Sequence, residues 1–355
     1  MSPDLPERRT YDVLRLVRTH EPVGSVKLTE RLRERGYSVT ERTVRLTLAD
    51  LDDRGFTEKV GGKGRRLTDA GRSELDRGGV WGRSDHVNER LAELTSRVDY
   101  DPETDRGNVV VGTVDVPRAD RDALAAVIED LDRSSLGPIG VSVETVEGVE
   151  TADGGSDLNE GGGEAGVLRV AAASSVTVNG VLLAAGIDAD LEALGVVEYH
   201  TEPDAVPYDD PEAADHGGAV LRYTDAIGNE RATFDVASVL IGAGRTDVDA
   251  ALAGERGLLV ADYLEYPIAR HDEGRELAVR TRDRLGGAID VRRPREPGPF
   301  PWGTSSWAFA SMTGVGAAEC LIACCVERGI AVDWETLAGV RDRGSLVSAS
   351  DVVLP

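Results

Sequence analysis

Residues 38–55, SVTERTVRLTLADLDDRG, decide the fold of the N-terminal part of this chain. Val44, Leu48 and Leu51 recur at the spacing that places apolar side chains along one side of an α-helix. Thr40 precedes this pattern and is a favourable residue for capping the N-terminus of a helix. The stretch therefore predicts an amphipathic helix with a buried stripe and a solvent-facing side.

The segments on either side of this helix predict further helices and a hairpin. Residues 7–20 and 25–36 each carry apolar residues at helical spacing. After the third helix, FTEKVGGKGRRLT (56–68) contains two short extended runs around Gly61-Gly62, a hairpin signal, and a short helix follows. Three helices followed by a glycine-turned basic hairpin predict a winged helix-turn-helix.

Such a fold places its third helix in the DNA major groove, with the wing near phosphates. Arginine pairs bidentately with guanine, and an apolar side chain contacts the thymine methyl group. A solvated amphipathic helix is the alternative for the third helix taken alone, but the ordered set of helices, wing and charge favours DNA binding. The residues expected to touch DNA are Arg42, Thr43, Arg45 and Leu46 on the helix, and Lys63, Arg65 and Arg66 on the wing.

The charge of the chain is divided unevenly. The 355 residues hold 40 Lys and Arg against 64 Asp and Glu, a formal net charge of −24. Residues 1–80 hold 17 basic and 14 acidic residues, a net of +3, whereas residues 81–355 hold 23 and 50, a net of −27. Such an asymmetry indicates a nucleic-acid-facing module joined to a strongly solvated one.

Only three of the basic residues are lysines, and the acidic residues are spread along the chain. This composition resembles that of proteins from organisms with molar salt in the cytoplasm, such as haloarchaea. No apolar run is long enough to span a bilayer, no signal peptide is visible, and three cysteines are too few for a disulfide framework. We expect a soluble, cytoplasmic protein with no membrane partner.

Beyond residue 100 the pattern alternates between strands and helices, which predicts α/β or α+β layering around a sheet. The helix HVNERLAELTSRV (86–98) is either a candidate dimer seam or packs on its own domain. The predicted domains are a winged helix-turn-helix (1–78), a linker helix (79–100) and a mixed α/β regulatory domain (101–355) containing a mobile acidic, glycine-rich loop (146–166).

Four segments of the chain resemble a known family. They are SDHVNERLAELTSRVDYDPETDRGNVVV (84–111), SSVTVNGVLLAAGI (174–187), YTDAIGNERATFDVASVLIGAGRTDV (223–248) and LLVADYLEYPIARHDEGRELAV (258–279). Together with the winged helix, they resemble NrpR, the archaeal nitrogen-regulatory repressor family. The resemblance covers most of the chain to about residue 295 and implies one regulatory domain. It also implies a homodimeric repressor of nitrogen-assimilation genes on palindromic double-stranded DNA operators, released by 2-oxoglutarate.

A dianion such as 2-oxoglutarate requires hydrogen-bond donors at both carboxylates. The segment 174–180 supplies hydroxyl and amide groups, and we expect Gly180 to open a helix whose N-terminal amides favour an anion. Arg169, Arg222 and Arg245 are available for a charge-assisted contact. The alternative is a capped helix with no ligand. The predicted effector-binding residues are Ser174, Ser175, Thr177, Asn179, Gly180, Tyr223 and Arg245.

Two positions depart from the family pattern. The family usually has Cys where this chain has Ser174, and Arg where it has Leu264. These departures keep open a winged-helix regulator whose C-terminal domain binds a different effector or a protein partner.

A metabolic enzyme is the remaining and less favoured alternative. The five histidines show no metal-like pairing, and Cys320, Cys324 and Cys325 fit a buried apolar helix better than a metal or redox site. GAGR (242–245) lacks the third glycine of a dinucleotide fingerprint. We therefore expect no catalytic residues, no metal and no cofactor, with 2-oxoglutarate as a possible effector.

Overall fold

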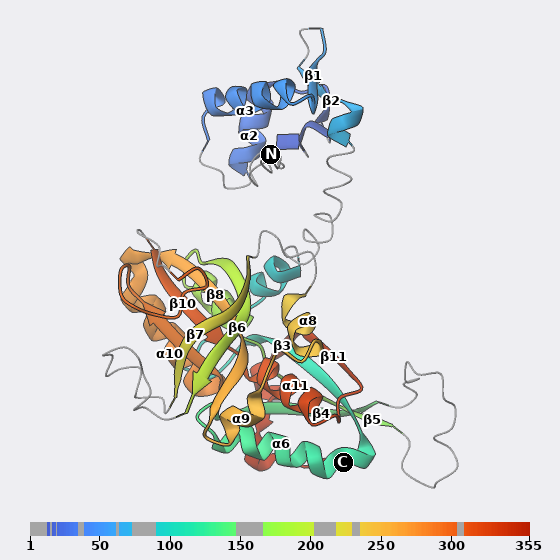
Figure 1. Ribbon diagram of the computed structural model, residues 1–355, viewed down its shortest axis with the longest axis vertical. Coiled ribbons are helices and arrows are strands. Elements are labelled where there is room, and N and C mark those ends of the chain that lie inside the picture. The colour runs from blue at the N-terminus through green and yellow to red at the C-terminus, as the bar shows by residue number, and fades with distance from the viewer. Residues whose placement is uncertain are drawn as a thin grey trace. The chain divides into compact units, whose positions relative to one another are not determined.

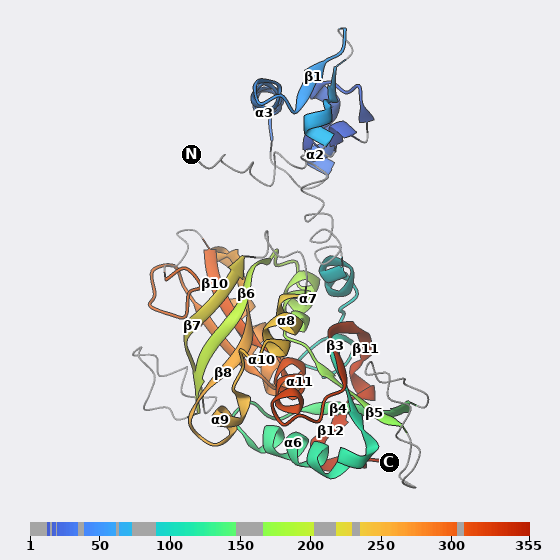
Figure 2. The same ribbon diagram turned by 45° about the vertical axis from the view of Figure 1, so that its right-hand side comes forward.

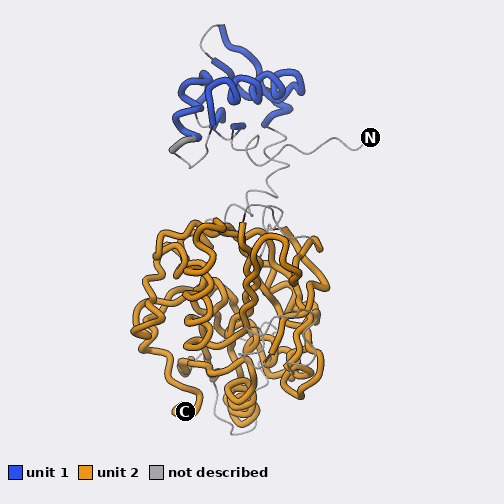
Figure 3. The backbone as a smooth tube through the Cα atoms, turned by 90° about the vertical axis from the view of Figure 1, so that its left-hand side faces the viewer, with its two compact units in different colours: residues 1–86 blue, residues 87–355 orange. Residues whose placement is uncertain are grey.

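The computed structural model describes residues 13–14, 16–18, 20–34, 39–61, 64–72, 90–146, 166–201, 218–228, 235–303 and 309–355. The chain divides into two compact units, Met1–His86 and Val87–Pro355 (Figure 3). Most of the loop predicted at 146–166 lies outside the described residues.

The first unit is a small helical domain with a two-stranded wing. Its described elements are the helical residues 13–14, 16–18 and 20, α2 (Ser25–Glu34), α3 (Glu41–Asp53), β1 (Thr57–Lys59) and β2 (Arg65–Leu67). β1 and β2 pair antiparallel, as the glycine-centred turn predicts. Helices followed by a two-stranded wing are the arrangement predicted for a winged helix-turn-helix.

The sequence pattern of α3 explains how the helix is held. Val44, Leu48 and Leu51 are buried in the core of the first unit. The Thr40 hydroxyl caps the helix by accepting a hydrogen bond from the Thr43 amide at 3.2 Å. In α2, Leu28 and Leu32 are buried while Val26 is exposed.

The second unit contains two five-stranded sheets in which every described strand pair is antiparallel. One sheet has the order β7-β6-β8-β10-β9 and the other β11-β3-β5-β4-β12 (Figures 1 and 2). The strands are β3 (Asn108–Pro117), β4 (Gly140–Val146), β5 (Val167–Ala173), β6 (Asp190–His200), β7 (Ala219–Gly228), β8 (Arg256–Pro267), β9 (Ala288–Arg292), β10 (Phe309–Val315), β11 (Asp333–Asp342) and β12 (Val347–Ser348).

Helices pack on and between these sheets. They are α6 (Arg121–Arg133), α7 (Val176–Ala184), α8 (Val236–Gly242), α9 (Val248–Leu252), α10 (His271–Leu285) and α11 (Ala317–Glu327). Short 3-10 turns lie at η1 (Arg118–Asp120), η5 (Ile268–Arg270), η6 (Arg343–Ser345) and η7 (Ala349–Asp351). α11 is buried along nearly its whole length, as its all-round apolar sequence requires. The second unit is therefore α+β, with antiparallel rather than parallel sheets.

Residues 90–96 are helical and pack on the second unit itself. Leu91, Leu94 and Val98 are buried in one apolar cluster with strand residues of β3 and β5 and with Val181 of α7. Of the two alternatives for this helix, packing on its own domain is thus confirmed. A dimer seam built from these three residues is wrong, because their side chains already have intramolecular partners.

Candidate nucleic-acid interface and effector site

The solvent-facing side of α3 carries the residues predicted to read DNA. Arg42, Arg45 and Leu46 are exposed, and Leu46 retains 64% of its accessible surface. Arg45 donates to Glu41 at 2.7 Å, one turn earlier on the helix. Exposed ion pairs of this kind contribute little to stability, so the guanidinium is easily redirected to another acceptor. This face therefore presents two cations and an apolar side chain together.

Thr43 lies on the same helix but has an intramolecular role. Besides the cap made by its amide, its hydroxyl lies 2.9 Å from the Thr40 hydroxyl. These contacts fix the start of α3. Thr43 therefore helps to position the exposed arginines of this helix.

The wing separates its two arginines. Arg66 on β2 is exposed and pairs with Glu58 on β1 at 2.6 Å. The Arg65 side chain is only 15% exposed and forms an ion pair with Asp52 of α3 at 2.9 Å. Arg65 therefore joins the wing to α3, and its contact with a DNA phosphate stays a prediction. Lys63 lies outside the described residues.

The serine-rich segment of the second unit forms a closed polar cluster with two acidic residues. The Ser174 hydroxyl donates to Glu319 Oε1 at 2.6 Å, and the Ser175 hydroxyl donates to Asp262 Oδ2 at 2.5 Å. The Thr177 hydroxyl donates to the Val110 carbonyl at 3.1 Å. We call Ser174, Ser175, Thr177, Asp262 and Glu319 the serine cluster; all five side chains are buried.

Burial shifts the ionisation of both acidic residues. It raises the pKa of Glu319 to about 7, with a further upward contribution from Asp262, and it raises the pKa of Asp262 to about 6. Hydrogen bonds from the two serines act in the opposite direction by stabilising the charged carboxylates. At neutral pH this cluster therefore carries negative charge, which repels a dianion.

The space beside the serine cluster is also small. A cavity lined by Ser174, Ser175, Thr177, Arg282 and Gly316 offers about 20 Å³ to water-sized molecules. That volume is close to the requirement of a single water molecule. The closed arrangement has no room for 2-oxoglutarate.

The other predicted effector residues occupy different positions. α7 begins at Val176, so Gly180 is inside the helix and does not open it, contrary to prediction. A Cβ atom on Gly180 would lie 2.4 Å from Val98 Cβ, so this glycine permits close packing. Asn179 is partly exposed on α7. Tyr223 does approach the cluster, since its hydroxyl donates to the Asp262 carbonyl at 3.2 Å.

The arginines available for a dianion already contact carboxylates. Arg169 pairs with Asp115 at 2.6 Å, Arg222 with Glu198 at 2.8 Å and Arg245 with Asp225 at 2.5 Å. Leu264 is buried in an apolar cluster with Leu182 and Met312. The signal that sequence reasoning missed is the pair Asp262 and Glu319, which reach the serines from β8 and α11.

The three cysteines, the remaining candidates for a metal or redox site, lie in the core. Cys320, Cys324 and Cys325 are free and buried, and burial raises the pKa of each thiol above its ordinary value. They form part of the apolar core, as the pattern of the helix predicts. Within the described ranges, no group of three or more His, Cys, Asp or Glu side chains is arranged to hold a metal ion. Among those same residues, no helix has the length and apolar character needed to cross a membrane.

Comparisons with known proteins match both units. A family model for the ribonuclease R winged-helix domain matches residues 12–75, and one for the NrpR regulatory domains NRD1 and 2 matches residues 85–207. The global nitrogen regulator NrpRI of Methanosarcina mazei is 29% identical over 295 residues, covering 82% of this chain and 83% of that protein.

Two further similarities are more limited. The global nitrogen regulator NrpR of Methanocaldococcus jannaschii is 33% identical over 95 residues, which cover 26% of this chain and 18% of that protein. The crystal structure of a nitrogen repressor-like protein from Methanococcus jannaschii aligns with a TM-score of 0.49 and 16% identity, covering 74% of this chain and 97% of that one.

Proposed function

We propose that this chain is a nitrogen regulator of the NrpR type, a DNA-binding repressor of nitrogen-assimilation genes that is released by 2-oxoglutarate. The observation that carries the DNA-binding part is the exposed side of α3, opposite the buried Val44, Leu48 and Leu51. A helix with this arrangement enters the major groove with its N-terminal part near base edges.

The chemistry of this face suits readout in concentrated salt. Phosphate contacts weaken as salt rises, because fewer counterions are released on binding. Arg42 and Arg45 pair with guanine, and Leu46 contacts a thymine methyl group, so specificity depends on base edges. The modest charge of residues 1–80, 17 basic against 14 acidic, is compatible with such an interface.

Homodimerisation on a palindromic operator is part of the same proposal. One recognition helix contacts few base pairs, and helix-turn-helix proteins extend their sites by placing two helices on successive turns of the duplex. The surface that joins two copies involves residues other than Leu91, Leu94 and Val98, which are buried within their own unit.

Similarity to the NrpR family supports 2-oxoglutarate as the effector. The serine cluster, in contrast, is unfavourable for the entry of a dianion. Asp262 and Glu319 oppose the approach of negative charge, and the adjoining cavity has room for about one water molecule. This observation favours the second candidate, a regulator whose C-terminal unit responds to a different ligand or to a protein partner.

Gel-shift assays in molar KCl, with promoter DNA of nitrogen-assimilation genes, test the DNA-binding part. We expect a shift with the wild-type chain and the Arg284→Ala control, an exposed arginine of the second unit, and a strongly reduced shift with Arg45→Ala. No shift on any promoter would contradict the proposed repressor.

Calorimetry with 2-oxoglutarate tests the effector part separately. If the dianion enters the serine cluster, Glu319→Gln removes an opposing charge and should tighten binding. If Glu319→Gln leaves the affinity for 2-oxoglutarate unchanged, the effector binds at another site. Absence of binding heat and of operator release would favour the second candidate.

A further inference from the structure

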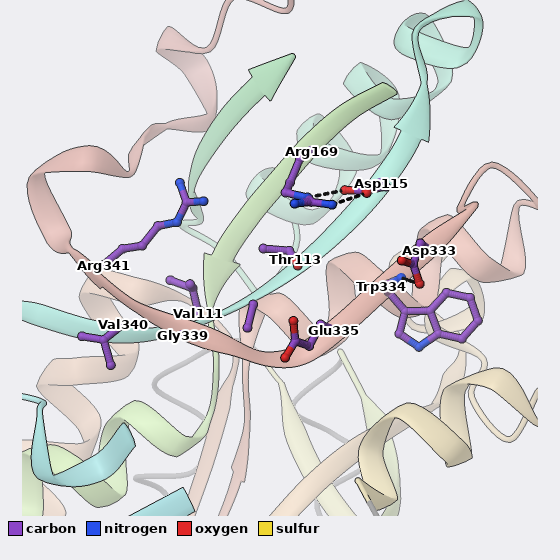
Figure 4. A pocket seen from close by; sticks show the side chains of 11 residues that line it. Val111, Thr113, Asp115, Arg169, Asp333, Trp334, Glu335, Gly339, Val340 and Arg341 are labelled. Atoms are coloured by element: carbon purple, nitrogen blue, oxygen red, sulfur yellow. Dashed lines mark hydrogen bonds and ion pairs between the residues drawn. The ribbon is translucent and has the colours of Figure 1, made fainter. Parts of the chain in front are cut away.

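A polar pocket lies beneath an irregular part of β11, and no residue of the serine cluster lines it (Figure 4). Glu335 pairs with Thr113 of β3 and Gly339 with Val111, so residues 336–338 lie opposite the single residue Gly112. Such a bulge bends its strand and often adjoins a functional site. We call the space of about 260 Å³ between this part of β11 and strands β3 and β5 the arch pocket.

The floor of the arch pocket contains buried polar groups. Asp115 is almost fully buried and accepts two hydrogen bonds from Arg169, at 2.7 Å from Nε and 2.6 Å from Nη2. Thr113 lines the pocket, is only 9% exposed, and its hydroxyl has no hydrogen-bond partner among the described residues. The hydroxyl oxygen itself is open to the pocket, so it is available to a ligand or to water.

The charges that line the arch pocket do not balance. Asp115, Asp333 and Glu335 line it together with Arg169 and Arg341, and Arg341 is bound by Glu144 at 2.5 Å. Three carboxylates thus face two guanidinium groups in the lining, an excess of one negative charge, and one of the two guanidinium groups is held by Glu144 from outside the pocket. Asp333 also lies directly opposite Asp115 in the strand register, where like charges destabilise a sheet.

The free hydrogen-bonding groups define what the pocket accepts. Arg169 Nη1 has no partner among the described residues, so it is available to a carboxylate. Asp333 and Glu335 have no cationic partner within hydrogen-bond distance in the described parts of the chain, so they are available to an ammonium group. A ligand that bears both a carboxylate and an ammonium group satisfies both sets, whereas the second carboxylate of a dicarboxylate is repelled by Asp333 and Glu335.

We propose that the arch pocket binds a free α-amino acid, with its carboxylate on Arg169, its ammonium group between Asp333 and Glu335, and the Thr113 hydroxyl as a further contact. The volume of about 260 Å³ lies just below the usual range for drug-sized ligands, which fits a metabolite as small as an amino acid. The site is distinct from the serine cluster, and its binding test requires no DNA.

The arch pocket also contacts the segment that leads to the first unit. Ala338 lines the pocket, and its carbonyl accepts a hydrogen bond from Arg90 Nη2 at 3.3 Å. Arg90 is the first described residue after 73–89, which contains the boundary between the two units. A ligand that moves the bulge therefore acts on the helical residues 90–96, the first described helix of the second unit.

Isothermal titration of the full chain in molar KCl tests the site with L-glutamine, L-glutamate, L-alanine and L-arginine. We expect at least one of them to bind at one site per chain. Asp333→Asn and Glu335→Gln should each weaken that binding about tenfold or more, since each removes a charged hydrogen-bond partner. Both side chains are exposed, and thermal unfolding checks that both variants fold.

Matched controls distinguish binding at this pocket from a general effect of removing a negative charge from the protein. Glu255→Gln, an exposed acidic residue outside the pocket, should leave binding unchanged, and the N-acetyl derivative of the bound amino acid should not bind. The proposal is overturned if none of the four amino acids binds, or if the two pocket variants bind as wild type does. It is also overturned if putrescine or 2-oxoglutarate displaces the amino acid stoichiometrically. The same holds if Glu255→Gln weakens amino-acid binding as much as the two pocket variants do.

Discussion

The outer face of α3 and the serine cluster differ in how their polar groups are used. On α3, Arg42, Arg45 and Leu46 are exposed and their intramolecular contacts are weak. In the serine cluster, the hydroxyls of Ser174 and Ser175 each donate to a buried carboxylate. Both segments are rich in polar residues, yet only the first leaves its groups available to a partner.

The difference teaches that a polar motif indicates a binding site only when its hydrogen bonds are not already satisfied inside the fold. Buried polar groups normally have partners, and those partners often come from distant parts of the chain. The following experiments sharpen this contrast or would remove it.

The largest effect is expected from removing the cations of α3. The double variant Arg42→Ala/Arg45→Ala should lose about 2–6 kcal/mol of specific binding free energy, because each bidentate contact with guanine contributes about 1–3 kcal/mol. Fluorescence anisotropy in molar KCl, with operator and scrambled duplexes, measures this loss, and Arg284→Ala is the control. Equal losses on both duplexes would mean that α3 does not read bases.

The next effect concerns Glu319, whose folded-state pKa of about 7 lies above its ordinary value of 4.5. The folded chain therefore binds more protons than the unfolded chain between these pH values, and the free energy of unfolding falls as pH rises through this window. Glu319→Gln, which does not titrate, should be more stable than wild type at pH 8 by up to about 3 kcal/mol.

That difference should disappear at pH 4, where Glu319 is protonated in both states. Urea unfolding at the two pH values measures it, with the exposed Glu255→Gln as the control. Equal stabilities of Glu319→Gln and wild type at both pH values would show that Glu319 does not carry a buried charge.

A smaller effect follows from the close packing of α7. Gly180→Ala places a Cβ atom against Val98 and should lower the free energy of unfolding by about 2 kcal/mol, as overpacking does. Asn179→Ala, on the partly exposed side of the same helix, should change it by less than about 0.5 kcal/mol. A Gly180→Ala variant as stable as wild type would instead leave room for a ligand role at this glycine.

The smallest effect is expected at the wing. Arg66→Ala should weaken binding to all DNA sequences alike and reduce the slope of log affinity against log salt by about 1, as expected for one phosphate contact. Arg65→Ala should instead destabilise the first unit, because it removes the partner of Asp52. A salt slope that changes with Arg65→Ala and not with Arg66→Ala would reverse this assignment.

The sequence was sufficient where contacts are local. The apolar spacing on α3, the Thr40 cap and the basic hairpin are all confirmed, since each depends on neighbouring residues. The separation of Arg65 from Arg66 was also predictable, because adjacent residues of a strand point to opposite sides.

Other features required the tertiary fold. Glu319 is 145 residues from Ser174, and Asp262 is 87 residues from Ser175, so no local pattern connects them. The arch pocket depends on the pairing of β11 with β3, which joins residues more than two hundred positions apart. The family resemblance identified the serine-rich segment but gave no information about the carboxylates that complete it.

Methylation interference on an operator duplex tests the central claim most directly. Dimethyl sulfate modifies N7 of guanine in the major groove and N3 of adenine in the minor groove. If Arg42 and Arg45 read guanines from α3, methylated guanines within each half-site should block the wild-type chain, and Arg45→Ala should lose sensitivity at one of them. Interference confined to adenine N3, or a guanine pattern unchanged by Arg45→Ala, would contradict the account.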